Sequence, residues 1–503
     1  MRSLKAVLVV LSLGSLAQAH IGSPDIYLDG KAGPYELFVT IRPPAVIPGL
    51  AELEIRSESA GVREIHAIPL PMSGPGARFA PVPDLLKVSP QDSHFFTGSL
   101  WMMATGSWQV RITVDGAQGR GILAVPVPSA PRTTKKMQFQ LGLMLSVLGL
   151  FLVGGLVAMS GAAVREARLR PGTIPNAKAR RRGRIGMSIA FLIVIGAVWA
   201  GNAWWSSEAN SYSQNVYKPL QMSASLNGSV LKLNLSDPGW LKPPPGRIPL
   251  FTRKMDDLIP DHDHLMHLYM LREPGLDMVY HLHPDLVSTG VFRLHLPTMP
   301  AGTYNLYADV VHATGFPETL VTKVNLPEIE GRPLSGDDAS GAAEPWSTGP
   351  LPSSFRLPDG YTMQWMKPAG QIHAKEPLLL TFKLTQPDGS APRDMAPYMG
   401  MLGHAAFVKT DGTVFAHIHP TGTVSMAAFM LAEKQVTNPS NTSSADVSGM
   451  NMPGMDHANT AHAALPNQVS FPYGFPSPGR YRIFVQMKHG QTIETGVFDA
   501  DVI

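Results

Sequence analysis

Residues 267–284 read HLYMLREPGLDMVYHLHP, and residues 404–420 read HAAFVKTDGTVFAHIHP. Each stretch begins with a histidine, passes through a turn and ends in His-x-His-Pro. Further along, each copy has a tyrosine followed eight residues later by another histidine: Tyr304 and His312 in the first copy, Tyr481 and His489 in the second. Four histidines therefore recur in matching order in each copy, which predicts an internal duplication with one kind of site.

The composition limits the class of protein. At 503 residues the chain is long enough for several domains. It contains 47 glycines and 46 prolines between short runs rich in Val, Thr, Tyr and Phe, which favours antiparallel β domains. The absence of cysteine excludes disulfides and thiolate metal sites. The net charge is only +3 and the basic residues are concentrated in one short loop, so nucleic acid is not an expected partner.

Two stretches, residues 139–164 and 185–205, predict transmembrane helices. The first has no charged residue, and the second ends in Trp204 and Trp205, as expected at a membrane interface. Residues 165–184 between them hold seven arginines, one lysine and a single acid. The positive-inside rule makes this loop cytoplasmic, so both flanking regions face outward. We therefore expect a bacterial inner (cytoplasmic) membrane protein with domains facing the periplasm or exterior.

The N-terminus supports this topology. Residues 1–19 combine a basic start, an apolar stretch and a small-x-small cleavage motif, which predicts a secretory signal peptide, with an uncleaved anchor as the alternative. Cleavage would leave His20 as the first residue. Its amine and imidazole would then chelate Cu(II) if His66 or His94 completed the site.

The rest of the sequence predicts a mainly β fold of three extracytoplasmic antiparallel β-sandwiches, in addition to the two transmembrane helices. The sandwiches cover residues 20–130, 206–330 and 355–503, and a Gly/Ser/Pro-rich linker is expected at 331–354. Within the third domain, residues 433–466 break the strand pattern and are expected to form a disordered, Met- and His-containing insertion.

The paired histidines carry the predicted chemistry. Residues i and i+2 of a strand share a face, and a hairpin turn brings the early histidine opposite them. Three or four imidazoles on one face suit copper or zinc. The predicted ligands of the first site are His267, His281, His283 and His312. Those of the second site are His404, His417, His419 and His489.

The two copies are unequal. Asp261-His262-Asp263-His264 precedes the first hairpin, where the second copy has Met399-Gly400-Met401, and this difference indicates either distinct metal preferences or simple surface decoration. The insertion adds four soft or borderline ligands, which would form a capture arm for copper or else a neutral low-complexity insert: Met450, Met452, Met455 and His457. Copper is therefore the first expected metal and zinc the second.

Other classes of function have weaker support. Histidines that only brace strands would make the chain a structural or interaction protein of the envelope. A hydrolytic or oxidative metal enzyme lacks an evident general base, although Asp261 or Asp263 would serve in the first copy, so the sequence favours a non-enzyme. No nucleophile elbow, phosphate loop or dinucleotide fingerprint is present.

Two sets of motifs resemble known families. The N-terminal part, with Gly22-Ser-Pro-Asp25 and LWMMATGSWQV at residues 100–110, resembles bacterial envelope β-sandwich domains of the YtkA/FixH type. The hairpins, with His281-Leu-His283-Pro284 and His417-Ile-His419-Pro420, resemble bacterial envelope domains that often accompany copper-handling genes. The resemblance implies cupredoxin-like or immunoglobulin-like sandwiches and a metal-related envelope role. Taken with the histidines and the two spans, the sequence predicts a membrane-anchored extracytoplasmic protein that binds copper for tolerance or for delivery, with an envelope metal-acceptor or donor protein as its partner.

Overall fold

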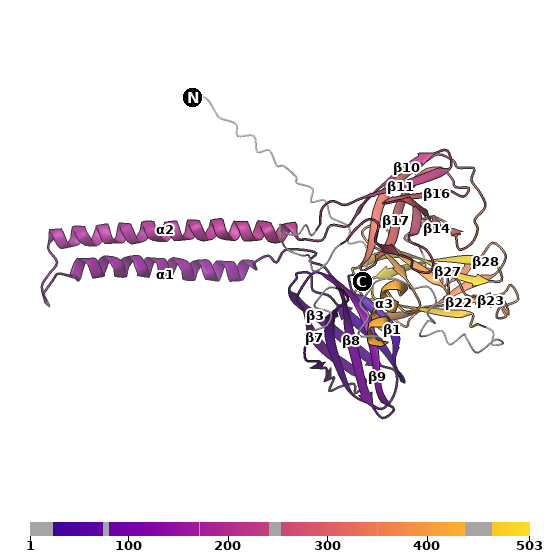
Figure 1. The fold of residues 1–503 in the computed structure, drawn as a ribbon, viewed down its shortest axis with the longest axis horizontal. Helices are drawn as coiled ribbons and strands as arrows, with labels where there is room; N and C mark the ends of the chain where they lie inside the picture. The colour runs from indigo at the N-terminus through magenta and orange to yellow at the C-terminus, as the bar shows by residue number, and fades with distance from the viewer. Residues whose placement is uncertain (1–23, 74–79, 171, 241–252, 350, 438–464) are drawn as a thin grey trace. The chain divides into compact units, whose positions relative to one another are not determined.

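The computed structural model describes residues 24–73, 80–170, 172–240, 253–349, 351–437 and 465–503. This part of the chain is mainly β, with several antiparallel sheets and two long helices (Figure 1). It divides into two compact units, one of β domains and one of residues Ala130–Tyr217 and Trp240–Lys242, which contains the two long helices. The predicted signal peptide, His20 and the insertion ligands Met450, Met452, Met455 and His457 lie outside the described residues.

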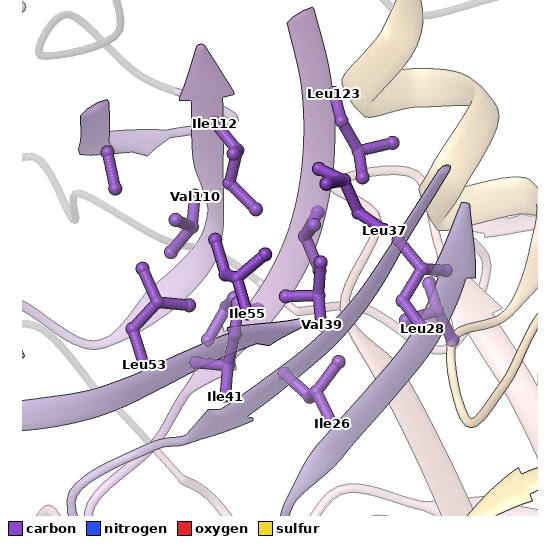
Figure 2. Close-up of a cluster of buried hydrophobic side chains, with 14 of the residues drawn as sticks. Ile26, Leu28, Leu37, Val39, Ile41, Leu53, Ile55, Val110, Ile112 and Leu123 are labelled. Atoms are coloured by element: carbon purple, nitrogen blue, oxygen red, sulfur yellow. The ribbon is translucent and has the colours of Figure 1, made fainter. Parts of the chain in front are cut away.

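The N-terminal domain is a sandwich of two antiparallel sheets, ordered β1-β2-β3-β7-β6 and β5-β4-β8-β9. Its strands are β1 (Ile26–Ala32), β2 (Tyr35–Arg42), β3 (Gly49–Ser57), β4 (Val62–Pro71), β5 (Asp84–Leu85), β6 (Lys87–Val88), β7 (Phe95–Met102), β8 (Gly106–Gly116) and β9 (Gly119–Ser129). Alternate apolar residues of both sheets, such as Val39, Ile55 and Ile112, point into one core (Figure 2).

Helices α1 (Phe139–Glu166) and α2 (Ala177–Gln214) are both long and apolar enough to cross a membrane. They run antiparallel and approach closely at Gly161, where an added Cβ would lie 2.2 Å from Met187 Cγ. Small residues at such a contact are typical of packed transmembrane helices.

Helix α2 is longer than the predicted second span and includes part of the expected basic loop. Helix α2 extends well beyond 185–205 at both ends, and the arginine-rich end of the predicted loop 165–184 is helical. The reason is local: the Asn176 side chain accepts a hydrogen bond from the Ala179 backbone N–H at 2.9 Å and caps the helix, and arginine is a good helix former.

The second domain contains two antiparallel sheets, one ordered β10-β11-β16-β15 and one ordered β12-β17-β13-β14-β19 with β18 also paired to β17. Its strands are β10 (Gln221–Asn227), β11 (Val230–Ser236), β12 (Leu258–Ile259), β13 (His267–Glu273), β14 (Met278–Leu282), β15 (Asp285–Ser288), β16 (Val291–His295), β17 (Gly302–His312), β18 (Pro317–Leu326) and β19 (Ala339–Ala342). Strand β19 falls inside the expected linker 331–354, which is therefore not structureless. It pairs with the edge of β14 that faces away from β13, so the backbone groups of that edge are also hydrogen-bonded.

The third domain repeats this arrangement, with sheets ordered β20-β21-β22-β26 and β23-β27-β24-β25 and with β28 paired to β27. Its elements are β20 (Ser354–Arg356), β21 (Thr362–Met366), β22 (Leu378–Thr385), β23 (Met395–Ala396), β24 (His404–Lys409), β25 (Phe415–Ile418), α3 (Met426–Thr437), β26 (Gln468–Tyr473), β27 (Gly479–His489) and β28 (Thr492–Val502). The insertion expected at 433–466 thus begins inside a helix, and residues 438–464 lie outside the described chain.

The strand registers define which residues of the two histidine domains are equivalent. In the first hairpin Tyr269 pairs with His281, and in the second Ala406 pairs with His417. On the neighbouring strands His267 is opposite Asp309, and His404 is opposite Gln486. The register therefore repeats as the duplicated stretches predict.

Candidate metal centre

The histidine hairpins of the two domains pack against each other within the β unit. Tyr307 of the first domain stacks on Phe415 of the second, with ring centroids 4.2 Å apart. Tyr269 belongs to the same buried apolar cluster and stacks on His281 at 4.1 Å. This contact brings the imidazole-bearing faces of both hairpins together.

Eight imidazoles form one continuous group, here called the histidine cluster. Its members are His262, His264, His267, His281, His283, His404, His417 and His419. Contacts between the repeats are similar in length to the His267–His281 contact of 5.4 Å within the first repeat. The ring centroids of His267 and His417 are 5.4 Å apart, and those of His262 and His404 are 5.1 Å apart.

The two predicted sites lie next to each other in one cluster, in which the triad His267, His281 and His283 comes from the first repeat alone. Both repeats present their His-x-His pair on the same face of the hairpin, and that face is the one that each repeat buries against the other. The sequence indicates which residues share a face, but it does not indicate what covers that face.

Two triads in the cluster have ligand atoms that all lie within 4.8 Å of one another. One triad consists of His267, His281 and His283. The other combines His262 of the first repeat with His404 and His419 of the second. His417 contacts rings of both triads. The arrangement can accommodate more than one metal ion.

Most members of the cluster are oriented by an oxygen outside it. His267 Nε2 donates a hydrogen bond to Asp261 O at 2.9 Å, and His281 Nδ1 donates one to Gln486 Oε1 at 2.9 Å. His283 Nδ1 donates to Asp338 Oδ1 at 3.0 Å, and His419 Nδ1 donates to Val424 O at 3.1 Å. His417 Nδ1 lies 3.2 Å from Asp309 Oδ2. Each ring then keeps a lone pair on its other nitrogen. Metal-binding histidines are typically held in this way by a carboxylate or carbonyl.

The facing nitrogens of His267 and His281 are unusually close. His267 Nδ1 and His281 Nε2 are 3.2 Å apart, and the opposite nitrogen of each ring donates its proton elsewhere. Two lone pairs at this distance repel each other unless a proton or cation lies between them. Two nitrogens bound to one tetrahedral zinc, each about 2.0–2.1 Å from the metal, are roughly 3.3 Å apart. The observed separation therefore suits two ligands of one metal ion.

Seven further ring nitrogens are buried without a hydrogen-bond partner among the residues that the structure describes. They are both nitrogens of His262 and of His404, and Nε2 of His283, His417 and His419. The Met399 backbone lies near His262 without reaching hydrogen-bond geometry. Buried polar atoms are nearly always paired, and each unpaired one costs about 1–3 kcal/mol. Metal coordination would satisfy several of these atoms together.

Burial keeps seven of the cluster imidazoles uncharged. Burial first, and neighbouring His419 second, lower the pKa of His262 to about 3. Burial also lowers the pKa of His267 to about 3, against the opposing charge of Asp261. The pKa values of His281, His283, His404, His417 and His419 are lowered as well, with burial as the largest cause. Neutral imidazole is the form that binds a metal ion.

The late histidines His312 and His489 lie apart from the cluster, which corrects their prediction as ligands of its two sites. Each is three residues beyond a cluster-facing residue of its strand, Asp309 and Gln486 respectively. An odd offset along a strand points a side chain to the opposite face. Their environments are instead carboxylate-rich, with His312 Nε2 3.0 Å from Glu318.

The sequence did not single out His262 and His264 as ligands, because surface decoration explained the Asp-His stretch equally well. The structure places them in a tight turn in which Asp261 and His264 form an isolated bridge. The second repeat has the same turn, closed by Tyr398 and Met401. His262 has a φ of 49°, a left-handed conformation that is uncommon for a residue other than glycine. The sequence did signal a shared turn, because Asp261–His264 and Met399–Met401 precede their hairpins at matching positions.

The N-terminal sandwich borders the site through the loop after His419. Gly422 forms an isolated bridge with Leu28, and a Cβ on this glycine would lie 1.9 Å from Tyr27 O. Its φ of 129° also favours glycine. Downstream, the Ala427 backbone N–H at the start of α3 donates to Asp261 Oδ1 at 2.7 Å. The third domain, the N-terminal sandwich and the first-repeat turn are therefore joined at the cluster.

Comparisons with known proteins give little beyond this geometry. The model of one family, the Domain of unknown function (DUF8832), matches residues 356–503. No curated protein matches the chain.

Similar solved structures are remote. They include a Salmonella alpha-2-macroglobulin reacted with methylamine (8% identity, TM-score 0.20, covering 94% of this chain and 24% of that one). Another is latent dimeric PorU from Porphyromonas gingivalis (7% identity, TM-score 0.14, covering 91% and 32%). A third is a bacterial ice-binding adhesin (6% identity, TM-score 0.14, covering 90% and 91%). Likenesses at these scores carry no argument about function.

Proposed function

We propose that this chain is a membrane-anchored protein that binds copper at the histidine cluster, with zinc as the second choice, for metal tolerance or for exchange with an envelope partner protein. The observation that carries the proposal is the orientation of the imidazoles. One nitrogen of most rings is fixed by an outer oxygen, while the other is a lone-pair donor buried among further imidazoles.

Copper is favoured by the type of ligand. Imidazole suits copper, zinc, iron and nickel, and the affinity of a given nitrogen site for divalent metals is greatest for copper. The chain contains no cysteine, so histidine and methionine are its available borderline and soft ligands. Two triads connected by His417 support binding of more than one ion.

The proposed location is a bacterial inner membrane, with the β domains on the periplasmic or exterior side. Two helices long and apolar enough to span a bilayer support anchoring. The basic run between them supports a cytoplasmic connection, because arginine-rich loops are retained on that side.

A structural role is the second candidate, and one observation favours it. His281 of the first repeat donates to Gln486 of the second, and His417 of the second lies against Asp309 of the first. Because His267 pairs with Asp309 and His404 with Gln486, these two contacts are equivalent and reciprocal. Such contacts would hold the repeats together without a metal.

Metal content of the full chain in detergent distinguishes the two functions. After equilibrium dialysis against Cu(II) or Zn(II), we expect at least about one tightly held ion per chain. His404→Ala and His417→Ala should lower this content, whereas His295→Ala, at an exposed histidine outside the cluster, should not. Circular dichroism verifies that each variant is folded. A metal content that the cluster variants leave unchanged would exclude metal binding by the cluster and leave the structural role.

A further inference from the structure

His489 occupies a second site rich in possible ligands, distinct from the histidine cluster. Its Nε2 lies 3.4 Å from Asp359 Oδ2 and 3.5 Å from Glu494 Oε1, and its Nδ1 lies 3.5 Å from Asp394 Oδ2. The imidazole is stacked on Tyr361, with ring centroids 4.2 Å apart, which fixes its plane. The ring is therefore held with one edge toward two carboxylates.

The key atom of this site is His489 Nε2. His489 is 8% exposed, and its Nε2 is buried without a hydrogen bond of normal geometry to any described residue. Glu494 beside it is 5% exposed. One potential ligand atom each from Asp359, His489 and Glu494 lies within 4.8 Å of the others. A buried imidazole nitrogen and two carboxylates thus converge on one point.

The first repeat contains the equivalent position with a different charge balance. Asp257 immediately precedes β12, which pairs with His312, just as Asp394 precedes β23, which pairs with His489. His312 contacts Asp257 at 2.5 Å and Glu318 at 3.0 Å. Both copies therefore build the same imidazole–carboxylate arrangement on the sheet face opposite the histidine cluster.

A cation is built into the first copy of this arrangement. Arg253 Nη1 lies 2.6 Å from Glu318 Oε1, and the Arg253 side chain is 3% exposed. In the second copy, the described chain places no lysine or arginine within ion-pair distance of Asp359, Asp394 or Glu494. The second copy instead gains a carboxylate, Asp359. Glu494 is buried and Asp359 is exposed. A buried carboxylate is costly to ionise without a cation, so an external cation would balance the charge of Glu494.

We propose that Asp359, His489 and Glu494 bind one divalent cation, of which zinc is the best chemical fit. Zinc accepts both imidazole nitrogen and carboxylate oxygen, and a site with three protein ligands leaves its fourth position to water. The cation takes the place that the Arg253 guanidinium has in the first repeat. It ties the end of β27 to β28 and to the turn at Asp359. This site does not depend on metal binding by the histidine cluster.

Zinc stoichiometry of the full chain in detergent tests the proposal. The double variant Asp359→Asn, Glu494→Gln keeps side-chain size and removes both charges. We expect it to hold about one zinc ion fewer than the wild type. Asp388→Asn, at an exposed carboxylate of the same domain, is the matched control and should retain the wild-type content.

Variants of the cluster separate this site from the proposed function. His404→Ala combined with His417→Ala should retain the ion at His489 even if every ion of the cluster is lost. Adding zinc to that variant should also raise its melting temperature, and the Asp359→Asn, Glu494→Gln changes should abolish the rise. Unchanged zinc content after these two changes, in a chain that is folded by circular dichroism, would overturn the proposal.

Discussion

At the scale of single residues, substitutions of His404 and of His417 distinguish a metal-binding role from a strand-bracing role. His404 is fully buried and both of its ring nitrogens lack a partner among the described residues, whereas His417 lies 3.2 Å from Asp309 Oδ2. In metal-free protein, His404→Leu should therefore stabilise the fold or leave it unchanged, because it removes unpaired buried atoms that cost about 1–3 kcal/mol. His417→Leu should destabilise it. Urea unfolding in the presence of a chelator measures both. Equal losses of stability would contradict a ligand role for His404.

Asp309 is expected to tune the metal through His417. Its carboxylate also accepts a hydrogen bond from Thr319 Oγ1, so its orientation is fixed. Asp309→Asn should weaken metal affinity about 10–100-fold while leaving the bound stoichiometry unchanged, as is typical when an outer partner of a metal-binding histidine is altered. Competition titration with a chromophoric chelator measures the affinity. Asp285→Asn, at an exposed carboxylate of the same domain, is the matched control. An affinity that Asp309→Asn leaves unchanged would exclude this positioning role.

The sequence predicted six of the eight cluster histidines, because the strand period of two decides which residues share a face. The same period shows that the side chains of His312 and His489 point away from the cluster face, but only once the pairing register of their strands is known. His262 was missed because its position depends on contact with His404 and His419 of the other repeat.

At the scale of elements, the two apolar helices and the hairpins were predictable, because a long uncharged stretch and an alternating pattern are local signals. Strand β19 and helix α3 were not predicted. Strand β19 is a short Gly/Ala/Ser segment whose strand character comes from pairing with β14, and α3 lies at the start of a polar insertion. Tertiary contacts that the sequence pattern does not carry decide both elements.

The helix pair offers a direct test at this scale. A Cβ on Gly186 would lie 3.1 Å from Val164 Cβ, just below the range of about 3.5–4.5 Å between the Cβ atoms of a disulfide, so a small outward shift of the helices would allow the bond. Because the chain has no cysteine, Val164→Cys with Gly186→Cys should cross-link within one chain in oxidised membranes. Gly154→Cys with Gly201→Cys is the control, since an added Cβ at either of these glycines meets nothing within 4 Å. Gel mobility under non-reducing conditions reports the cross-link, and equal yields for both pairs would contradict the antiparallel packing.

At the scale of the whole molecule, the proposed metal site is a property of two domains together. Neither repeat alone contains the triad of His262, His404 and His419. Its formation depends on burial of the two hairpin faces against each other, through contacts such as Tyr307 on Phe415. A duplication read from sequence indicates two equivalent faces, but the pairing of those faces is a tertiary event with no local pattern.

The buried histidines also predict how the stability of the whole metal-free protein depends on pH. Folding lowers the pKa of His262 and His267 from about 6.5 to about 3, so the unfolded chain binds more protons between these values. Stability from these groups is present above about pH 6.5 and is lost as the pH falls, by about 1.4 kcal/mol per pH unit for each histidine that stays neutral. Five more cluster histidines have lowered pKa values.

Buried carboxyls act in the opposite direction. Burial raises the pKa of Asp309 to about 7 and that of Asp338 to about 6, so their contribution to stability is present at low pH and is lost as the pH rises through these values. Asp29, Glu433 and Glu494 also have raised pKa values. The lowered histidines outnumber these carboxyls, so the melting temperature should fall between pH 6 and pH 5 in the presence of a chelator. His404→Leu removes one of the histidines and should make this fall shallower. A metal-free protein that melts higher at pH 5 than at pH 6 would show that the cluster is open to water and protonated in the folded state.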